Sequence, residues 1–184
     1  MKKRNRYEIA FTGAGGQGMI LAGLVMADAV AIVENRYAVQ SAMYGPEARL
    51  GSSRSDVIIS DSEIGYPKAT RPDLLLVMNQ DSCTKYTKLL KENGLLICDT
   101  TYVSHIPGEK DIKNLYKVPF SRIARSEFGT PLVANIMALG FISAKTGIVK
   151  KESLAEAIKR RVKQKFVNLN LKALERGYEL GKEM

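Results

Sequence analysis

Residues 7–18 read Tyr-Glu-Ile-Ala-Phe-Thr-Gly-Ala-Gly-Gly-Gln-Gly, and this stretch indicates the fold class. The apolar run at 7–11 predicts a buried strand. Residues 18–33 are so apolar that they predict a helix covered on several sides, by a sheet and by a partner. Gly13, Gly15 and Gly18 have the spacing of a turn that brings backbone N–H groups to a phosphate. Together these features predict a βα unit.

The rest of the chain alternates in the same way. Short β-type runs predict strands at 37–41, 57–60, 74–78 and 95–98, and an edge strand at 116–118. Residues 43–55 are rich in glycine, serine and arginine and predict a loop. Helical patterns cover 80–92, 131–145 and 165–181, with a further helix around Ser153. Thr130 and Pro131 predict the start of the second of these helices, and Gly147 its end.

This pattern predicts an α/β fold with three layers, α/β/α, a mainly parallel sheet and a helical C-terminal third. A length of 184 residues is that of one domain, so we expect residues 1–184 to form a single domain.

The charge distribution says more than the net charge of +9. Cations gather in the first six residues and again at 159–165, where glutamates accompany them on helical patterns. We interpret the second group as a solvated helix face, with an acidic protein partner or an anionic substrate as the alternative. No aromatic residues are interleaved as in surfaces that stack bases, so a nucleic-acid partner is not expected.

Cys83 and Cys98 are the two cysteines of the chain, and they are too few for an iron–sulfur ligand set or a paired-cysteine metal site. We expect two buried thiols. The basic N-terminus is not followed by the apolar segment of a signal peptide, and the run at 19–33 is too short to span a bilayer. The expected location is the cytoplasm, without a membrane partner.

A nucleotide site has little support in the sequence. A dinucleotide site needs an acidic residue at the end of the second strand, but this chain has Gln40 there, and Glu34 comes too early. A P-loop needs a lysine after its glycines, but Met19 follows them here. The glycine turn therefore serves backbone packing, or another ligand or partner.

No nucleophile and base can be paired either. His105 lies beside a Pro-Gly turn and is expected to be a surface or packed loop residue. Asp56, Asp73 and Asp99 lie in strands or at their ends, where such residues usually cap and turn the chain. We predict no catalytic residue and no metal ligand in this chain, which favours an incomplete part of a site in a larger assembly.

Six segments, taken together and in order, resemble the gamma subunit of 2-oxoacid:ferredoxin oxidoreductases over nearly the whole chain. They are Gly-Ala-Gly-Gly-Gln-Gly-Met at 13–19, Tyr-Gly-Pro-Glu-Ala-Arg at 44–49, Ser-Asp-Val-Ile-Ile-Ser-Asp at 55–61, Arg-Pro-Asp-Leu at 71–74, Gly-Leu-Leu-Ile-Cys-Asp at 94–99 and Leu-Val-Ala-Asn-Ile-Met-Ala-Leu-Gly at 132–140. Residues 168–178 resemble the final helix of that family.

The resemblance implies a subunit of a multisubunit enzyme that decarboxylates a 2-oxoacid on thiamine diphosphate. Electrons then pass through iron–sulfur clusters to ferredoxin, and the acyl group passes to coenzyme A. Thiamine diphosphate and the clusters are implied to lie on partner subunits, alpha, beta and, where present, delta, so that this chain alone binds no cofactor.

The resemblance also implies which residues face the partners and the coenzyme A region. They are Gly13, Gly15, Gly16, Gln17, Gly18, Tyr44, Gly45, Pro46, Glu47, Arg49 and Asn135. Arg49 could bind a carboxylate or phosphate with Glu47 orienting it, or could form an intersubunit salt bridge. Asn135 lies in an otherwise apolar helix and needs a partner, so we expect it to hydrogen-bond the glycine loop. Leu50-Gly51 departs from the Gly-Gly of the family pattern.

The segment Tyr-Gly-Pro-Glu-Ala-Arg resembles the 2-oxoglutarate branch of the family, so we expect 2-oxoglutarate as the substrate. Pyruvate, branched-chain 2-oxoacids and indolepyruvate are the alternatives within the class. Two alternatives of other classes are a stand-alone nucleotide-binding regulatory module and a basic nucleic-acid-binding domain, which would bind with a steep dependence on salt.

Overall fold

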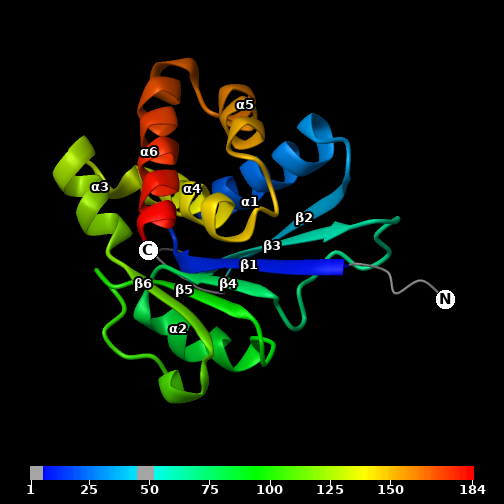
Figure 1. Cartoon of the computed structure of the whole chain (residues 1–184), viewed down its shortest axis with the longest axis vertical. Coiled ribbons are helices and arrows are strands. Elements are labelled where there is room, and N and C mark those ends of the chain that lie inside the picture. The colour runs from blue at the N-terminus through cyan, green and yellow to red at the C-terminus, as the bar shows by residue number, and fades with distance from the viewer. Residues whose placement is uncertain (1–5, 45–51) are drawn as a thin grey trace.

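The computed structural model describes residues 6–44 and 52–184 (Figure 1). Its strands are β1 (Arg6–Ala14), β2 (Tyr37–Tyr44), β3 (Ser52–Ser60), β4 (Leu74–Val77), β5 (Leu95–Asp99) and β6 (Asn114–Val118). Its α-helices are α1 (Met19–Asp28), α2 (Gln80–Tyr86), α3 (Phe120–Phe128), α4 (Ala134–Thr146), α5 (Lys151–Arg161) and α6 (Gln164–Glu183). A π-helical turn, η1 (Ala29–Val33), continues α1, and short 3₁₀ turns are η2 (Thr87–Leu89), η3 (Glu109–Asp111) and η4 (Pro131–Val133).

The strands form one sheet in the order β2-β3-β1-β4-β5-β6. β1, β4, β5 and β6 are parallel, whereas β3 is antiparallel to both of its neighbours, β1 and β2. Most neighbouring pairs are parallel, which confirms the predicted mainly parallel sheet. The sheet is mixed because only seven residues, 45–51, separate β2 from β3, whereas a parallel pair needs a crossover of about a dozen residues or more.

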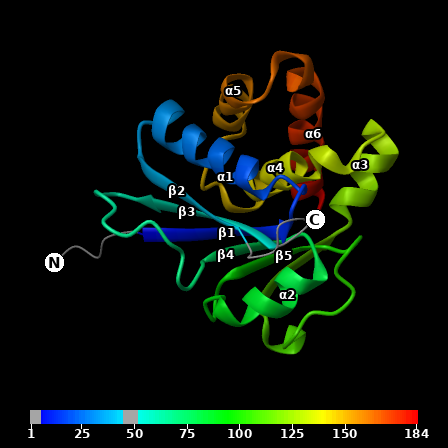
Figure 2. The same ribbon diagram turned by 180° about the vertical axis from the view of Figure 1, so that it is seen from behind.

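Helices cover both faces of this sheet (Figures 1 and 2). α1, α4, α5 and α6 lie over one face, and α2 lies over the other. Alternate residues of β4 enter the two layers: Leu74 and Leu76 join the larger buried cluster, and Leu75 and Val77 join the cluster with α2. The predicted three-layer α/β/α arrangement and the helical C-terminal third are confirmed.

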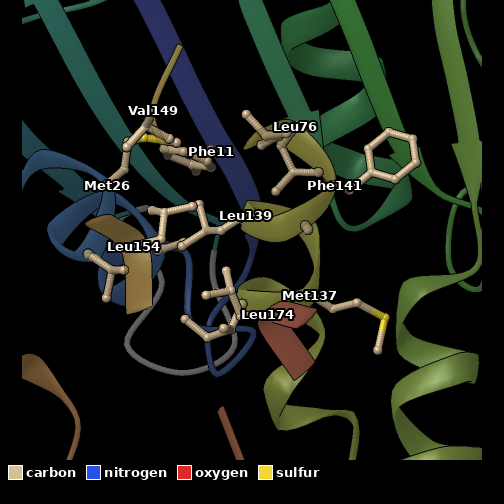
Figure 3. Packing of buried hydrophobic residues seen from close by; sticks show 14 of the residues in the cluster. Phe11, Met26, Leu76, Met137, Leu139, Phe141, Val149, Leu154 and Leu174 are labelled. Atoms are coloured by element: carbon tan, nitrogen blue, oxygen red, sulfur yellow. The ribbon is translucent and has the colours of Figure 1, made fainter. Parts of the chain in front are cut away.

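The larger cluster is the main hydrophobic core. Figure 3 shows Phe11 of β1, Leu76 of β4 and Leu139 of α4 packed together, and all three are fully buried. α4 and α5 of the same chain pack on α1. These two helices bury apolar surface of α1 that the sequence had led us to expect a partner to bury. Ile32 and Val33 in η1 remain exposed.

Glycines let α4 and α6 cross very closely. A Cβ atom on Gly177 would lie 1.8 Å from the carbonyl oxygen of Met137, and one on Gly140 would lie 2.1 Å from that of Leu174. Backbone atoms at such distances cannot move aside without separating the helices. Glycines on both α4 and α6 therefore fix how deeply the C-terminal helix sits on the core.

The predicted loop at 43–55 is wrong at both ends. β2 continues to Tyr44 and β3 begins at Ser52, so residues 43–44 and 52–55 are strand. The rest of the predicted loop, residues 45–51, lies outside the described residues. The first half of β3 is polar yet buried, because its polar groups are hydrogen-bonded within the strand, to β2 and to Ala69. Gln40 Nε2 donates to Ser55 Oγ at 2.7 Å, and Arg54 Nε donates to Asp56 Oδ1 at 2.6 Å. A strand of this kind shows no apolar periodicity.

Helix α3 was not predicted, and α2 is shorter than the predicted 80–92. α3 begins where the backbone N–H of Ser121 donates to Asp99 Oδ2 at 3.0 Å. This cap comes from the end of β5, far away in sequence, so no local signal marks the start of the helix. α2 ends at Tyr86, and one 3₁₀ turn follows it.

The C-terminal helices agree with their predicted signals. Thr130 Oγ1 accepts a hydrogen bond from the backbone N–H of Leu132 at 3.2 Å, and Pro131 opens η4, which leads into α4. Gly147 ends α4 with a φ of 60°, in the left-handed region. Ser153 lies inside α5. No helix in the described ranges is both long and apolar enough to cross a membrane.

Candidate functional site

The glycine loop connects β1 to α1 at the carboxyl end of the parallel strands. Gly16 and Gly18 have φ values of 90° and 74°, which side chains with a Cβ rarely adopt. Gly15 and Gly16 form the turn itself, and Gly18 is the N-cap of α1 without any side-chain cap. The predicted glycine turn is therefore present.

Gln17 holds this loop in place through both ends of its amide. Its Oε1 accepts from the backbone N–H of Ala14 at 2.7 Å, and its Nε2 donates to the carbonyl oxygen of Met78 at 2.8 Å. A Cβ on Gly13 would lie 2.6 Å from the same Oε1. The amide of Gln17 thus ties the end of β1 to the end of β4 and shapes the loop from within.

Asn135 contacts the loop from α4. Its Nδ2 donates to the carbonyl oxygen of Gly18 at 2.9 Å, and its Oδ1 accepts from the backbone N–H of Ile136 at 2.8 Å. A Cβ on Gly18 would lie 2.3 Å from that Nδ2. The predicted hydrogen bond between this buried amide and the glycine loop is confirmed.

The loop lies where the chain leaves neighbouring parallel strands toward opposite faces. β1 continues into α1 on one face, while β4 continues into α2 on the other. Open α/β sheets bind ligands at this kind of position. A small hollow of about 70 Å³ lies here, lined by Gly16, Gln17, Met78, Tyr102, Ser121, Pro131, Leu132 and Ala134. Tyr102 and Leu132 are 43% and 68% exposed at its rim.

The electrostatics of this edge favour an anion. α1 has no acidic residue in its first turn, and Gly18 leaves its first N–H groups without a side-chain acceptor. The N-terminus of a helix carries about half a positive charge. Arg125 of α3 contacts one of the lining residues, with its Nη2 at 3.4 Å from the hydroxyl of Tyr102.

The register brings Tyr44 to the same edge of the sheet as the glycine loop. Ser53 of β3 is paired with Gly13 on one side and with Tyr44 on the other. Strands lie about 4.8 Å apart, so these two positions are roughly 10 Å from each other. Both ends of the segment between Tyr44 and Ser52 therefore lie beside the loop. Gly45, Pro46, Glu47, Arg49 and Leu50 lie outside the described residues.

Sequence reasoning missed a buried ion pair on β3. Arg54 and Asp56 are 5% and 0% exposed, and both bind Ala69: Arg54 Nη2 donates to its carbonyl oxygen at 2.5 Å, and Asp56 Oδ2 accepts from its N–H at 3.0 Å. The guanidinium also lies 4.9 Å from the ring centre of Tyr86. Burial raises the pKa of Asp56, although the bonds from Arg54 oppose it. The spacing Arg-x-Asp, which places both side chains on one face of a strand, was the available signal.

The cysteines and the histidine are where the sequence predicted. Cys83 and Cys98 are buried and free, and His105 is exposed. The neighbouring thiol of Cys98 lowers the pKa of Cys83, and Cys83 together with burial raises the pKa of Cys98. Within residues 6–44 and 52–184, no three histidine, cysteine or acidic side chains are grouped to hold a metal ion.

The carboxylates mostly support the backbone, as predicted. Asp73 Oδ2 accepts from the N–H of Glu8 at 2.8 Å, and Asp99 Oδ1 accepts from the N–H of Thr101 at 3.0 Å. Glu34 Oε1 accepts from the N–H of Lys150 at 2.8 Å.

The cations at 159–165 are exposed, which agrees with a solvated face. Arg161 among them pairs with Asp28, with Nη2 at 2.7 Å from Oδ1.

Comparison with known proteins places this arrangement in a family. The family model described as pyruvate ferredoxin/flavodoxin oxidoreductase matches residues 8–180. The 2-oxoglutarate synthase subunit KorC of Methanocaldococcus jannaschii is 43% identical over an alignment of 187 positions that covers the whole of both chains. The ketoisovalerate oxidoreductase subunit VorA of Methanothermobacter thermautotrophicus is 36% identical over 95% of this chain, but only over 36% of its own length.

A solved structure agrees. The gamma subunit of a keto/oxoacid ferredoxin oxidoreductase from Geobacter sulfurreducens superposes with a TM-score of 0.84 at 44% identity, over 95% of each chain. The chain therefore belongs to the pyruvate ferredoxin/flavodoxin oxidoreductase family and is a gamma subunit of a 2-oxoacid:ferredoxin oxidoreductase.

Proposed function

We propose that this chain is the gamma subunit of an enzyme that oxidatively decarboxylates 2-oxoglutarate. The products are succinyl-CoA, CO₂ and two electrons, which reduce ferredoxin. The observation that carries the choice of substrate is the 43% identity with a 2-oxoglutarate synthase subunit over the full length of both chains. The ketoisovalerate relative is less similar and is a much longer chain.

In this proposal the chemistry of carbon–carbon cleavage is supplied by thiamine diphosphate on another subunit. Two observations support this division. Residues 13–18 form a glycine loop without a nucleophile, and the described residues hold no cluster that would ligate a metal or an iron–sulfur centre. The partners are the alpha and beta subunits, with a delta subunit where present, and ferredoxin accepts the electrons. The enzyme works in the cytoplasm, and residues 1–184 act as one domain.

The role of this chain is to contact coenzyme A and the partner subunits at the carboxyl edge of the sheet. Gly13, Gly15, Gly16 and Gly18 let a phosphate approach the backbone N–H groups at the start of α1. Gln17 and Asn135 use their amides to hold that loop in shape. Their role is to position the loop and not to react.

The segment from Tyr44 to Arg49 is the second part of this proposed site. Tyr44 is 75% exposed at the end of β2, beside the glycine loop. In this proposal Arg49 binds a carboxylate or phosphate and Glu47 orients it, or Arg49 pairs with another subunit. Substitution of Arg49 separates these roles, since loss of an intersubunit pair lowers subunit content whereas loss of a ligand contact lowers turnover alone.

The test is anaerobic purification of the chain from its own cells, followed by coenzyme A-dependent reduction of viologen dye. Four substrates are compared: 2-oxoglutarate, pyruvate, 2-oxoisovalerate and indolepyruvate. We expect larger subunits with thiamine diphosphate and iron–sulfur clusters to co-purify, and 2-oxoglutarate to give the highest kcat/KM. A higher value for another 2-oxoacid would reject the substrate, and a lone monomer that binds adenine nucleotides would reject the role as a subunit.

A further inference from the structure

The two edges of the sheet differ in how they are protected. An edge strand exposes unpaired N–H and C=O groups, and proteins usually shield it with charged residues, prolines or a short length. β6 follows this rule: it has five residues, contains the exposed Lys117 and is followed directly by Pro119. Lys145 also covers Tyr116 of β6, with its Nζ 4.7 Å from the ring centre. These features discourage the addition of a further strand at this edge.

β2 at the opposite edge has none of this protection. Its sequence, Tyr-Ala-Val-Gln-Ser-Ala-Met-Tyr over residues 37–44, contains no charge and no proline. Among the described residues, β3 is the one strand that pairs with it. A neutral edge of eight residues is long for a strand that faces water.

The faces of β2 are used within the chain, which leaves the edge itself as the open feature. Gln40 Nε2 donates to Ser55 Oγ on one face, and Ser41 Oγ donates to the carbonyl oxygen of Pro67 at 2.8 Å. Exposed apolar side chains lie at both ends of the strand. Tyr37 is 54% exposed, and Tyr44 is 75% exposed. η1 packs against β2 and adds Ile32, which is 56% exposed.

We propose that a strand of another subunit of the same enzyme adds to the outer edge of β2 in the assembled complex. This inference rests on the proposed function, because it takes its partner from the enzyme described there. Main-chain hydrogen bonds to β2 would provide the attachment, and the exposed apolar groups at its ends would be buried.

Three observations favour another subunit over a second copy of this chain. Two copies would each bring a net charge of +9, and this like charge opposes their association. In the ketoisovalerate relative the matching region is only 36% of the chain, so there this module is joined to further parts of its enzyme. The Tyr44 end of β2 also lies at the carboxyl edge beside the glycine loop. A strand added here would bring residues of the partner to the part of the site that this chain leaves incomplete.

The decisive measurement is hydrogen–deuterium exchange of the backbone amides in the isolated chain and in the purified holoenzyme. Alternate N–H groups of β2 point away from β3 and gain a partner only if a strand is added. We expect them to exchange at least about tenfold more slowly in the complex. Equal exchange in the two states would overturn the inference. Slow exchange already in the isolated chain, together with a dimer mass, would also overturn it and would identify a second copy as the occupant.

A charged residue on the edge gives an independent test. Ala42 is exposed on β2, and Asn114 is exposed on the protected edge strand β6, so Ala42→Lys and Asn114→Lys place the same charge on opposite edges. We expect both variants to fold with the circular dichroism of the parent chain. Ala42→Lys should lower the recovery of partner subunits about tenfold or more, and Asn114→Lys should not change it. Normal recovery with Ala42→Lys would overturn the inference.

These outcomes are separate from failure of the proposed function. A complex with slow-exchanging β2 amides that prefers another 2-oxoacid would reject the substrate and support the edge. A complex that oxidises 2-oxoglutarate while the β2 amides exchange freely would support the substrate and overturn strand addition at β2.

Discussion

Substitution of Gly177 by alanine tests whether the close crossing of α4 and α6 sets the stability of the chain. The added Cβ would lie 1.8 Å from the carbonyl oxygen of Met137 and 2.7 Å from its carbonyl carbon. Both are backbone atoms of α4, so no side-chain rotation relieves the contact. The helices would have to separate by roughly 1.5 Å to restore an ordinary van der Waals distance.

Two free-energy changes oppose each other in this variant. Overpacking of a core costs about 1–3 kcal/mol, and contact with backbone puts this site at or above the upper end. Alanine in place of glycine within a helix returns about 1 kcal/mol. We therefore expect a net loss of about 2–3 kcal/mol in the free energy of unfolding. For a chain of this length, that corresponds to a decrease in Tm of roughly 4–12 °C.

The assay is thermal and urea unfolding of the isolated chain, followed by far-ultraviolet circular dichroism. Gly65→Ala is the matched control, because a Cβ there meets nothing within 4 Å and its backbone is not in the left-handed region. It should change the free energy of unfolding by less than about 1 kcal/mol. Gly140→Ala meets the carbonyl oxygen of Leu174 at 2.1 Å in the same crossing. The double variant should lose less than the sum of the two, because the helices separate once. A Gly177→Ala chain as stable as the parent would refute the reasoning.

Four further predictions concern the site and the charged groups. Asn135→Ala removes the hydrogen bond to the carbonyl oxygen of Gly18 and should lower the free energy of unfolding by about 1–3 kcal/mol. It should also raise the KM for coenzyme A in the assembled enzyme, and an unchanged KM would argue against coenzyme A binding at the glycine loop. Asp56→Asn should lower the free energy of unfolding in urea by about 3–5 kcal/mol, because it leaves Arg54 buried without its carboxylate. The double variant Arg54→Met with Asp56→Leu should lose clearly less, and equal losses in the two variants would contradict this. Burial raises the pKa of Glu34, but its hydrogen bonds lower it by more, so the folded-state pKa lies below the unfolded value of 4.5. The contribution of Glu34 to stability is therefore present above pH 4.5 and is lost as pH falls through the folded-state pKa. The stability advantage of the parent chain over Glu34→Gln should shrink in acid, and a difference that stays constant with pH would argue against this. Arg49→Ala should lower the turnover of the assembled enzyme at unchanged subunit content, and unchanged turnover would remove Arg49 from the site.

Much of the site could be predicted because its signals are local. The glycines mark a turn by their conformational freedom, and Asn135 is conspicuous as an amide in an apolar helix. The capping residues around α4 likewise act within a few positions of one another. Such features need no knowledge of distant contacts. The identities of the partners and of the residues that touch coenzyme A stay predictions.

The errors fell where distant contacts replace local signals. The polar start of β3 is a strand because Arg54, Asp56 and the serines around them find partners on neighbouring strands and on the loop at Ala69. α3 begins at a carboxylate supplied by the end of β5. Apart from the Arg54–Asp56 pair within β3, these hydrogen bonds join residues that only folding brings together, and hydropathy along the chain does not report them.

The sequence by itself determined the βα unit, the alternation of strands and helices, and the family, because each rests on residue types at fixed local spacing. Only the tertiary structure decided that β3 inserts antiparallel between β2 and β1, so that Tyr44 and the glycine loop meet at one edge. It also decided that, among the described strands, β2 and β6 lie at the two edges of the sheet. Strand order follows from how the helices pack over the two faces of the sheet, and that packing sums many weak contacts between residues distant in sequence.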